Sequence, residues 1–217
     1  MSKVKLKHAS GNSMAIAAPP TNPASDLELK LPATIGTAGQ VLGVDGSGNL
    51  TWTDVPSITQ SSWTAFGTGT TTEITGISAN AIEITVVGVD ISAVDNSQLL
   101  RLRLGGAGGY KTSGYEVTSC EGGGSNSGQG RTAGFEQQYV GAQAYAMNIV
   151  WRLTKANSNI WNLSGYTNAG NGTETTDFRL NGTVDLGEAL TKLQFDLSGS
   201  GGNAFDGGSW RIYTTAI

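Results

Sequence analysis

The sequence contains few of the residues on which catalytic and metal centres are usually built. Its 217 residues include one cysteine, Cys120, and one histidine, His8. A single cysteine can form neither an intrachain disulfide nor a cysteine-based zinc site. A nucleophilic cysteine also needs a base beside it, and His8 lies far from Cys120 in the sequence. We therefore expect no enzymatic activity, no cofactor and no metal.

Charged residues and long apolar runs are also scarce. Charged residues make up 14% of the chain, below the roughly 25% typical of soluble domains. The formal net charge of −4 disfavours nucleic acid as a partner, because binding to phosphates depends on lysine and arginine. No stretch approaches the about 20 apolar residues of a membrane-spanning helix, and no apolar stretch follows the basic start as in a secretion signal. We expect neither membrane insertion nor export.

Proline is confined to the first part of the chain. All five prolines lie within residues 1–56, where apolar runs are short. Proline favours an extended backbone and cannot donate to a β-ladder. Such a segment buries too little apolar surface to offset about 1 to 2 kcal/mol of backbone entropy per residue. Residues 1–56 are therefore predicted to be an attachment arm that orders on neighbouring chains through its apolar side chains: Leu27, Leu29, Leu31, Val41 and Leu42.

Within this arm, residues 39–52 predict a small hairpin. Two short strand-like runs flank a glycine-rich turn. Because an isolated hairpin is marginally stable, we expect this one to depend on a partner.

Residues 57–217 predict an all-β head domain. Short alternating runs are separated by glycine, asparagine, serine and threonine, and about eight candidate strands can be counted. Continuous alternation without helical periodicity argues against a parallel α/β fold. We expect an antiparallel β-sandwich with jelly-roll-like connections.

Two strands of this domain support detailed expectations. Leu100, Leu102 and Leu104 share one face, which should be the core, while Arg101 and Arg103 share the other. These arginines should point outward or to another subunit. The apolar phase shifts at residues 86–87, which predicts a β-bulge there beside a glycine.

Two motifs resemble phage structural proteins. The first combines Leu31-Pro32, Thr37-Ala38-Gly39-Gln40-Val41-Leu42 and Gly48-Asn49-Leu50-Thr51-Trp52, and is similar to a module of tail-fibre and other virion proteins of marine phages such as cyanophages and pelagiphages. The second is Leu104-Gly105-Gly106-Ala107-Gly108-Gly109-Tyr110-Lys111-Thr112-Ser113-Gly114-Tyr115, which resembles a motif of phage tail-fibre C-terminal domains. Where those relatives often carry a polar pair, this sequence has Gly106-Ala107.

The resemblance implies a structural protein located in the virion. It implies a homotrimer of tail-fibre type whose arm contacts other virion proteins and whose head takes part in host adsorption. A capsid decoration or head-fibre protein without a receptor role is the first alternative. The second alternative is a glycan depolymerase, which would need two carboxylates a few ångströms apart, and the candidates lie in presumed loops: Glu121, Glu136, Glu174, Asp177 and Asp206.

A candidate glycan-binding segment spans residues 157–168, where aromatic residues alternate with amides and hydroxyls. A pyranose ring can stack on Trp161 or Tyr166, while the side chains of Asn159 and Asn162 pair with its hydroxyls. The competing interpretation makes Trp161 a core or subunit-interface residue. The glycine-rich stretches at 105–109 and 122–130 do not match a nucleotide-binding loop, so we interpret them as turns or close chain contacts.

Overall fold

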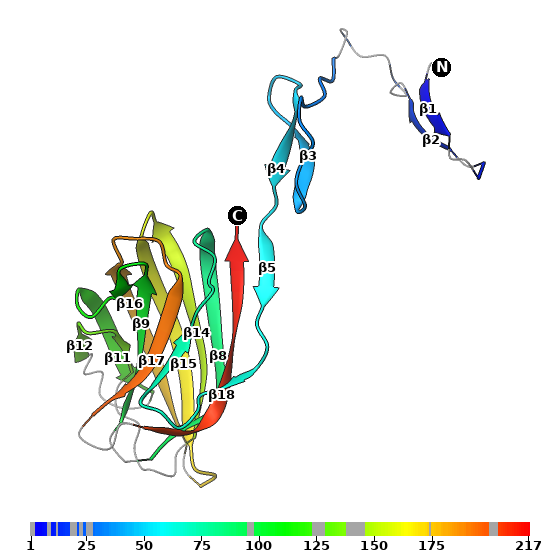
Figure 1. Ribbon diagram of the computed structural model, residues 1–217. Coiled ribbons are helices and arrows are strands. Elements are labelled where there is room, and N and C mark those ends of the chain that lie inside the picture. The colour runs from blue at the N-terminus through cyan, green and yellow to red at the C-terminus, as the bar shows by residue number, and fades with distance from the viewer. Residues whose placement is uncertain are drawn as a thin grey trace. The chain divides into compact units, whose positions relative to one another are not determined.

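The structure is a computed structural model in which the chain divides into two compact units, Met1–Val55 and Pro56–Ile217. It describes residues 3–7, 10, 11, 13–17, 21, 24, 28–94, 98–122, 129–137, 146–173, 175–199 and 204–217. All regular elements of these residues are β-strands (Figure 1), so the predicted all-β fold class is confirmed. Among the same residues, no helix has the length and apolar content needed to cross a membrane.

The first unit contains two antiparallel hairpins. They are formed by β1 (Lys3–Lys7) with β2 (Ser13–Ala17), and by β3 (Gln40–Val44) with β4 (Leu50–Asp54). The β3–β4 hairpin is the one that the sequence predicts within residues 39–52.

The side chain of Asp45 organises the turn of that hairpin. One carboxylate oxygen accepts hydrogen bonds from the backbone N–H groups of Ser47 at 2.8 Å and Asn49 at 2.9 Å. The other accepts one from the Asn49 amide at 2.8 Å. Hydrogen bonds from Asn49, first from its side chain and then from its backbone, lower the pKa of the Asp45 carboxyl. This turn chemistry is local, which is why the hairpin can be predicted from the sequence.

The second unit is built from two antiparallel sheets. The large sheet runs in the order β12-β11-β16-β15-β14-β8-β18-β5, with β6 added beside β18, and the small sheet runs β10-β9-β17-β7, with β13 added beside β9. The large-sheet strands are β5 (Ser57–Gln60), β6 (Thr64–Ala65), β8 (Ala81–Ala93), β11 (Tyr115–Glu121), β12 (Gln129–Arg131), β14 (Ala146–Asn157), β15 (Ile160–Gly170), β16 (Thr175–Asp185) and β18 (Phe205–Ala216). Those of the small sheet are β7 (Thr71–Ile74), β9 (Leu99–Gly106), β10 (Gly109–Tyr110), β13 (Phe135–Glu136) and β17 (Lys192–Ser198).

Part of this strand order is that of a jelly roll. Eight strands, taken along the chain as β5, β7, β8, β9, β13, β14, β17 and β18, are divided between the sheets. The order β5-β18-β8-β14 lies in the large sheet and β7-β17-β9-β13 in the small sheet. The hairpins β14–β15 and β15–β16, followed by β11 and β12, widen the large sheet beyond this core. The wide sheet leaves a broad outer face, meaning the face turned away from the small sheet.

One apolar core joins the two sheets. Leu100, Leu102 and Leu104 of β9 are fully buried, as their alternation predicts. The indole of Trp151 in the large sheet contacts the ring of Phe195 in the small sheet, with 5.7 Å between ring centres. Side chains from both sheets therefore share the interior that the predicted sandwich requires.

The bulge of β8 lies a few residues after the predicted position. Residues 86–87 pair regularly with β14 and β18, whereas the register with both neighbours shifts between residues 88 and 93. Asp90 has a positive φ of 53°, and its backbone N–H donates to the side chain of Asn148 at 3.2 Å. On the paired strand β18, Gly208 also has a positive φ, and a Cβ at this position would lie 2.6 Å from the Cα of Ile91 in β8. The close approach of the β8 and β18 backbones decides where β8 bends. The sequence pattern of β8 alone does not contain this contact.

Candidate functional site: the outer face of the large sheet

The alternation of β15 decides which residues of the candidate glycan segment are accessible. Asn162 and Ser164 point to the outer face, together with Tyr166, whose side chain is 47% exposed. Trp161, which precedes Asn162, and Leu163, which lies between Asn162 and Ser164, point into the core. Successive side chains of a strand lie on opposite faces, so only the first group can meet a ligand on the outer face.

The prediction of Trp161 as a sugar-stacking residue is wrong. Its side chain is 1% exposed and lies in the core of the second unit. A sugar ring stacks only on an aromatic face that it can reach. The competing interpretation of Trp161 as a core residue is correct.

Asn159 lies in the turn between β14 and β15, at the end of the sheet. Its backbone carbonyl accepts a hydrogen bond from the N–H of Leu186 at 3.0 Å. Its amide nitrogen, turned toward the carbonyl oxygens of Ser158 and Glu188, donates to both at 3.1 Å. The structure thus brings Asn162 and Tyr166 together on one face, while Asn159 holds the turn against the segment that precedes β17.

An apolar row crosses the outer face from Tyr166. Tyr166 lies opposite Val150 of β14 on one side and Arg179 of β16 on the other. Val150 is 50% exposed and lies opposite Val87 of β8, which in turn lies opposite Arg211 of β18. Neither Arg179 nor Arg211 forms an ion pair with a residue that the structure describes.

Aromatic side chains surround the far end of this row. The guanidinium carbon of Arg211 lies 4.3 Å from the ring centre of Trp63 and 5.4 Å from that of Tyr213. Trp63 remains 44% exposed. The arginine is therefore held by cation–π contacts, and the indole of Trp63 presents apolar surface at the edge of the sheet.

A concavity of about 570 Å³ lies at the β11–β16 side of the large sheet. This volume falls within the roughly 300 to 1,000 Å³ of ligand-binding pockets. Its lining is formed by Tyr115, Glu116, Val117, Thr118, Arg131, Thr132, Asn181, Gly182 and Thr183. Thr118 lies opposite Asn181, and Glu116 lies opposite Thr183, which also faces Asn162 across β15. The side chains of these four lining residues therefore lie on the face that carries Tyr166.

Sequence reasoning missed the polar lining of this concavity. Glu116 and Thr118 come from β11, and Asn181 and Thr183 come from β16, two strands that are distant in the sequence but paired in the sheet. Each strand does carry the signal of polar residues two positions apart. Only the pairing shows that the two polar pairs share one surface.

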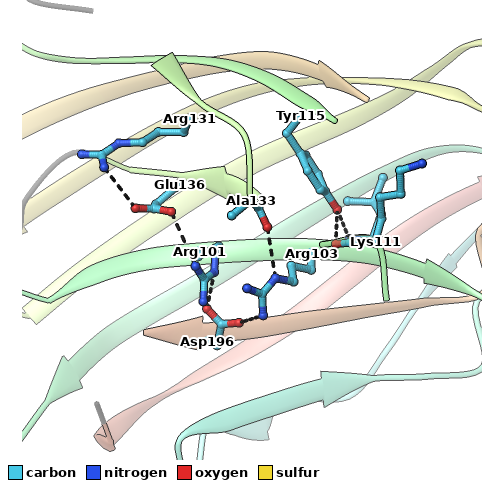
Figure 2. A network of polar contacts seen from close by, with 9 residues as sticks. Arg101, Arg103, Lys111, Tyr115, Arg131, Ala133, Glu136 and Asp196 are labelled. Atoms are coloured by element: carbon cyan, nitrogen blue, oxygen red, sulfur yellow. Dashed lines mark hydrogen bonds and ion pairs between the residues drawn. The ribbon is translucent and has the colours of Figure 1, made fainter. Parts of the chain in front are cut away.

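A network of charged side chains lies on the other face of β9 (Figure 2). Asp196 accepts a hydrogen bond from Arg101 Nε and another from Arg103 Nη1, both at 2.6 Å. Glu136 lies 3.7 Å from Arg101 and 3.5 Å from Arg131. Both carboxylates are nearly buried. Arg101 and Arg103 lie on the face of β9 opposite the core, as predicted, but they are largely covered and their charges are paired within the chain. Contact of these arginines with another subunit stays a prediction.

The glycine-rich motif beside this network is closed by its own first and last residues (Figure 2). The Tyr115 hydroxyl accepts a hydrogen bond from the backbone N–H of Leu104 at 2.9 Å and donates to the carbonyl of Lys111 at 3.3 Å. Between them, the N–H of Gly108 donates to both carboxylate oxygens of Glu188, at 2.9 and 3.2 Å. Because the Gly108 N–H already donates to Glu188, it is not available to a ligand. The loop at 105–109 is therefore a structural turn, as interpreted from the sequence.

Replacing Tyr115 by phenylalanine should flatten the loss of stability at alkaline pH. Burial raises the pKa of Tyr115 to about 12. Above pH about 10 the unfolded chain ionises while the folded chain largely does not, so the free energy of unfolding falls, by roughly 2 kcal/mol when pH reaches 12. Below pH about 10 this contribution is fully present. Urea unfolding of both proteins between about pH 9 and 12 should show a steeper fall for the native sequence.

The comparison of slopes isolates the phenol, because lysine ionisation is common to both proteins. Tyr115→Phe itself should cost about 1 to 3 kcal/mol at neutral pH, since the buried N–H of Leu104 loses its acceptor. Parallel slopes in the alkaline range would contradict the raised pKa.

Among the residues that the structure describes, no two of the carboxylates considered for a depolymerase are shown to form a pair. Glu136 is engaged by arginines, and Asp206 accepts a hydrogen bond from Ser92. Glu121 and Asp177 lie at the ends of β11 and β16, and Glu174 lies outside the described residues. No cluster of three metal-ligating side chains occurs in the part of the chain that the structure describes. The expectation of no enzymatic activity stays a prediction.

The predicted attachment residues of the first unit are exposed where the structure describes them. Leu29 and Leu31 precede the β3–β4 hairpin, and Val41 and Leu42 lie in β3. Leu27 lies outside the described residues. Ile35, Val44 and Trp52 are further exposed apolar residues of this unit that the sequence analysis did not single out.

No protein-family model matches the chain, and no curated protein is significantly similar to it.

Proposed function

We propose that the chain is a structural protein of a phage virion, an oligomeric appendage of tail-fibre type. The unit Met1–Val55 attaches it to neighbouring chains, and the jelly-roll unit forms its head. The proposal draws on the resemblance of both motifs to virion proteins. It also draws on the contrast between a head with a continuous core and a first unit whose residues 28–55 contribute nothing to a buried apolar cluster.

The observation that carries the proposal is the exposed apolar surface of the β3–β4 hairpin. Leu42, Val44 and Trp52 lie on one face and are all exposed, while Val41 is exposed on the other. Among the apolar residues of 28–55, the part of this unit whose side-chain burial the structure describes, Leu50 alone is buried. A hairpin that buries so little is marginal by itself, so contact with another chain supplies the missing burial.

A homotrimer fits this requirement and the resemblance. Cyclic association places the same apolar surface of each copy against its neighbour, so that every copy is satisfied. Three heads on one appendage also multiply weak contacts with a host surface, because each further contact becomes intramolecular.

The location in the particle is tested by labelling purified virions with an antibody against the head. Label at the tail supports the fibre-type role, whereas label over the capsid lattice favours a decoration protein without a receptor role. Absence of the chain from purified particles, measured by mass spectrometry, would reject both.

Replacing Val41 and Leu42 together by serine should weaken assembly. We expect the native chain of 22.4 kDa to behave as a trimer in light scattering coupled to gel filtration, and the double variant to shift toward smaller species. The reason is that each serine removes an apolar side chain that would be buried between chains. Thr53→Ser, an exposed change in the paired strand, should leave the mass unchanged. A compact native monomer whose first 55 residues resist proteases would contradict the proposal.

A further inference from the structure

The concavity beside β11 and β16 carries polar groups that the fold does not use. The side chains of Glu116, Thr118, Asn181 and Thr183 reach the outer face, and none of them bonds to a residue that the structure describes. Together they present a carboxylate that accepts, an amide that donates and accepts, and hydroxyls that do both. This is the complement of a surface with many hydroxyl groups.

Tyr166 provides an aromatic face next to these groups. It lies directly opposite Arg179, and Asn181 is two residues further along the same face of β16. Such diagonal neighbours are about 7 to 8 Å apart, within reach of an aromatic side chain. Asn162 and Ser164 lie between the tyrosine and the concavity, opposite Thr183 and Asn181.

We propose that this surface is a binding site for a neutral, hydroxyl-rich glycan. One sugar ring stacks on Tyr166, and the next sugars lie over β15 and β16 with their hydroxyls paired to Asn162, Asn181, Thr118 and Glu116. The inference rests on the proposed host-adsorption role of the head and names its ligand class. It places the centre of the site on β11 and β16, where the sequence hypothesis had no residue.

The charge of the concavity itself disfavours an acidic sugar placed over it, whereas Arg179, which has no ion-pair partner among the described residues, lies outside the lining, opposite Tyr166, and acts only on the ring stacked there. Glu116 is the one carboxylate among the lining residues, and its charge repels a uronate placed over the concavity. Arg131 also lines the concavity, but its guanidinium lies 3.5 Å from Glu136 and is already paired. A neutral sugar avoids the repulsion and still donates hydroxyl hydrogens to Glu116.

A matched pair of probes tests this selection with the full-length protein. β-1,4-Mannohexaose and the β-1,4-mannuronate hexamer share their linkage and differ at the sixth carbon, and cellohexaose and laminarihexaose extend the neutral set. Calorimetric titration should detect binding of at least one neutral hexamer and at least tenfold weaker binding of the mannuronate.

Variants locate the site. Tyr166→Ala and Asn181→Ala should each weaken neutral-glycan binding by about tenfold, and Glu116→Gln by about tenfold because a charged hydrogen bond is lost. Glu116→Gln should also reduce the preference for neutral over acidic hexamer. Gln60→Ala, an exposed change in β5 at the other edge of the large sheet, should bind as the native protein does.

Three outcomes would overturn the inference. They are no binding of any neutral hexamer, equal binding of the mannuronate, and a loss of binding with Trp63→Ala but not with Tyr166→Ala. A change in oligomeric mass with Tyr166→Ala and Asn181→Ala, without glycan binding by the native chain, would instead assign the surface to contact between copies. Glycan binding is measured on isolated protein, so its failure is distinct from absence of the chain from the virion.

Discussion

Replacing Asp196 by alanine should lower the free energy of unfolding by about 3 to 5 kcal/mol. The carboxylate is 5% exposed and accepts hydrogen bonds from both Arg101 and Arg103 at 2.6 Å. Its removal leaves two largely buried guanidinium groups without their main partner, and the unpaired charges are the source of the loss. For a unit of this size the melting temperature should fall by about 10 °C.

Two further variants separate charge pairing from other effects. Glu121→Ala removes an exposed carboxylate and should change the free energy of unfolding by no more than about 0.5 kcal/mol. Replacing Arg101 and Arg103 by methionine and Asp196 by leucine removes Asp196 together with both of its partners. This change should recover much of the loss, because the remaining buried carboxylate, Glu136, keeps Arg131 as its partner. If Asp196→Ala lowers the free energy of unfolding no more than Glu121→Ala does, the network does not stabilise the fold.

Trp151→Ala should also lower the free energy of unfolding by about 3 to 5 kcal/mol. The indole is fully buried between the two sheets, with Phe195 on one side. Its N–H donates to the Thr167 hydroxyl at 3.0 Å. A Cβ at Gly165 would lie 2.8 Å from the indole, so the absence of a side chain there makes room for the ring. Alanine at 151 leaves a cavity bounded by both sheets, and chemical denaturation measures the cost.

Trp63→Ala is the matched control for this prediction. Trp63 is 44% exposed and contacts Arg211 through its ring. Its removal should cost about 0.5 to 1 kcal/mol, the value of an exposed cation–π contact. Equal losses for the two variants would show that the interior is less tightly packed around Trp151 than the structure indicates.

Local patterns were sufficient for the strand faces but not for their partners. The spacing of Leu100, Leu102 and Leu104 identified the core side of β9, because alternation is a property of one strand. The same spacing placed Arg101 and Arg103 on the opposite side, yet it contained nothing about Asp196. That residue follows them by more than ninety positions in the sequence and lies next to them only because β17 pairs with β9.

The candidate site shows the same division within one segment. The mixture of aromatic and amide residues in 157–168 drew attention to Trp161 and Tyr166 alike. Burial separates them, since Trp161 faces the core and Tyr166 the outer face. Composition describes which chemistry a segment carries, whereas the face that the small sheet covers decides which of its side chains meet a ligand.

From the sequence alone follow the all-β class, the alternating strands, the hairpin turn at Asp45 and the shortage of apolar material in the first unit. Each depends on residues close together in the chain, where propensity, turn chemistry and periodicity act. The jelly-roll strand order, the Asp196 network and the joining of β11 with β16 at one concavity were decided only by tertiary structure. These features depend on which distant strands pair, and pairing is selected by the burial of the whole core rather than by any one segment.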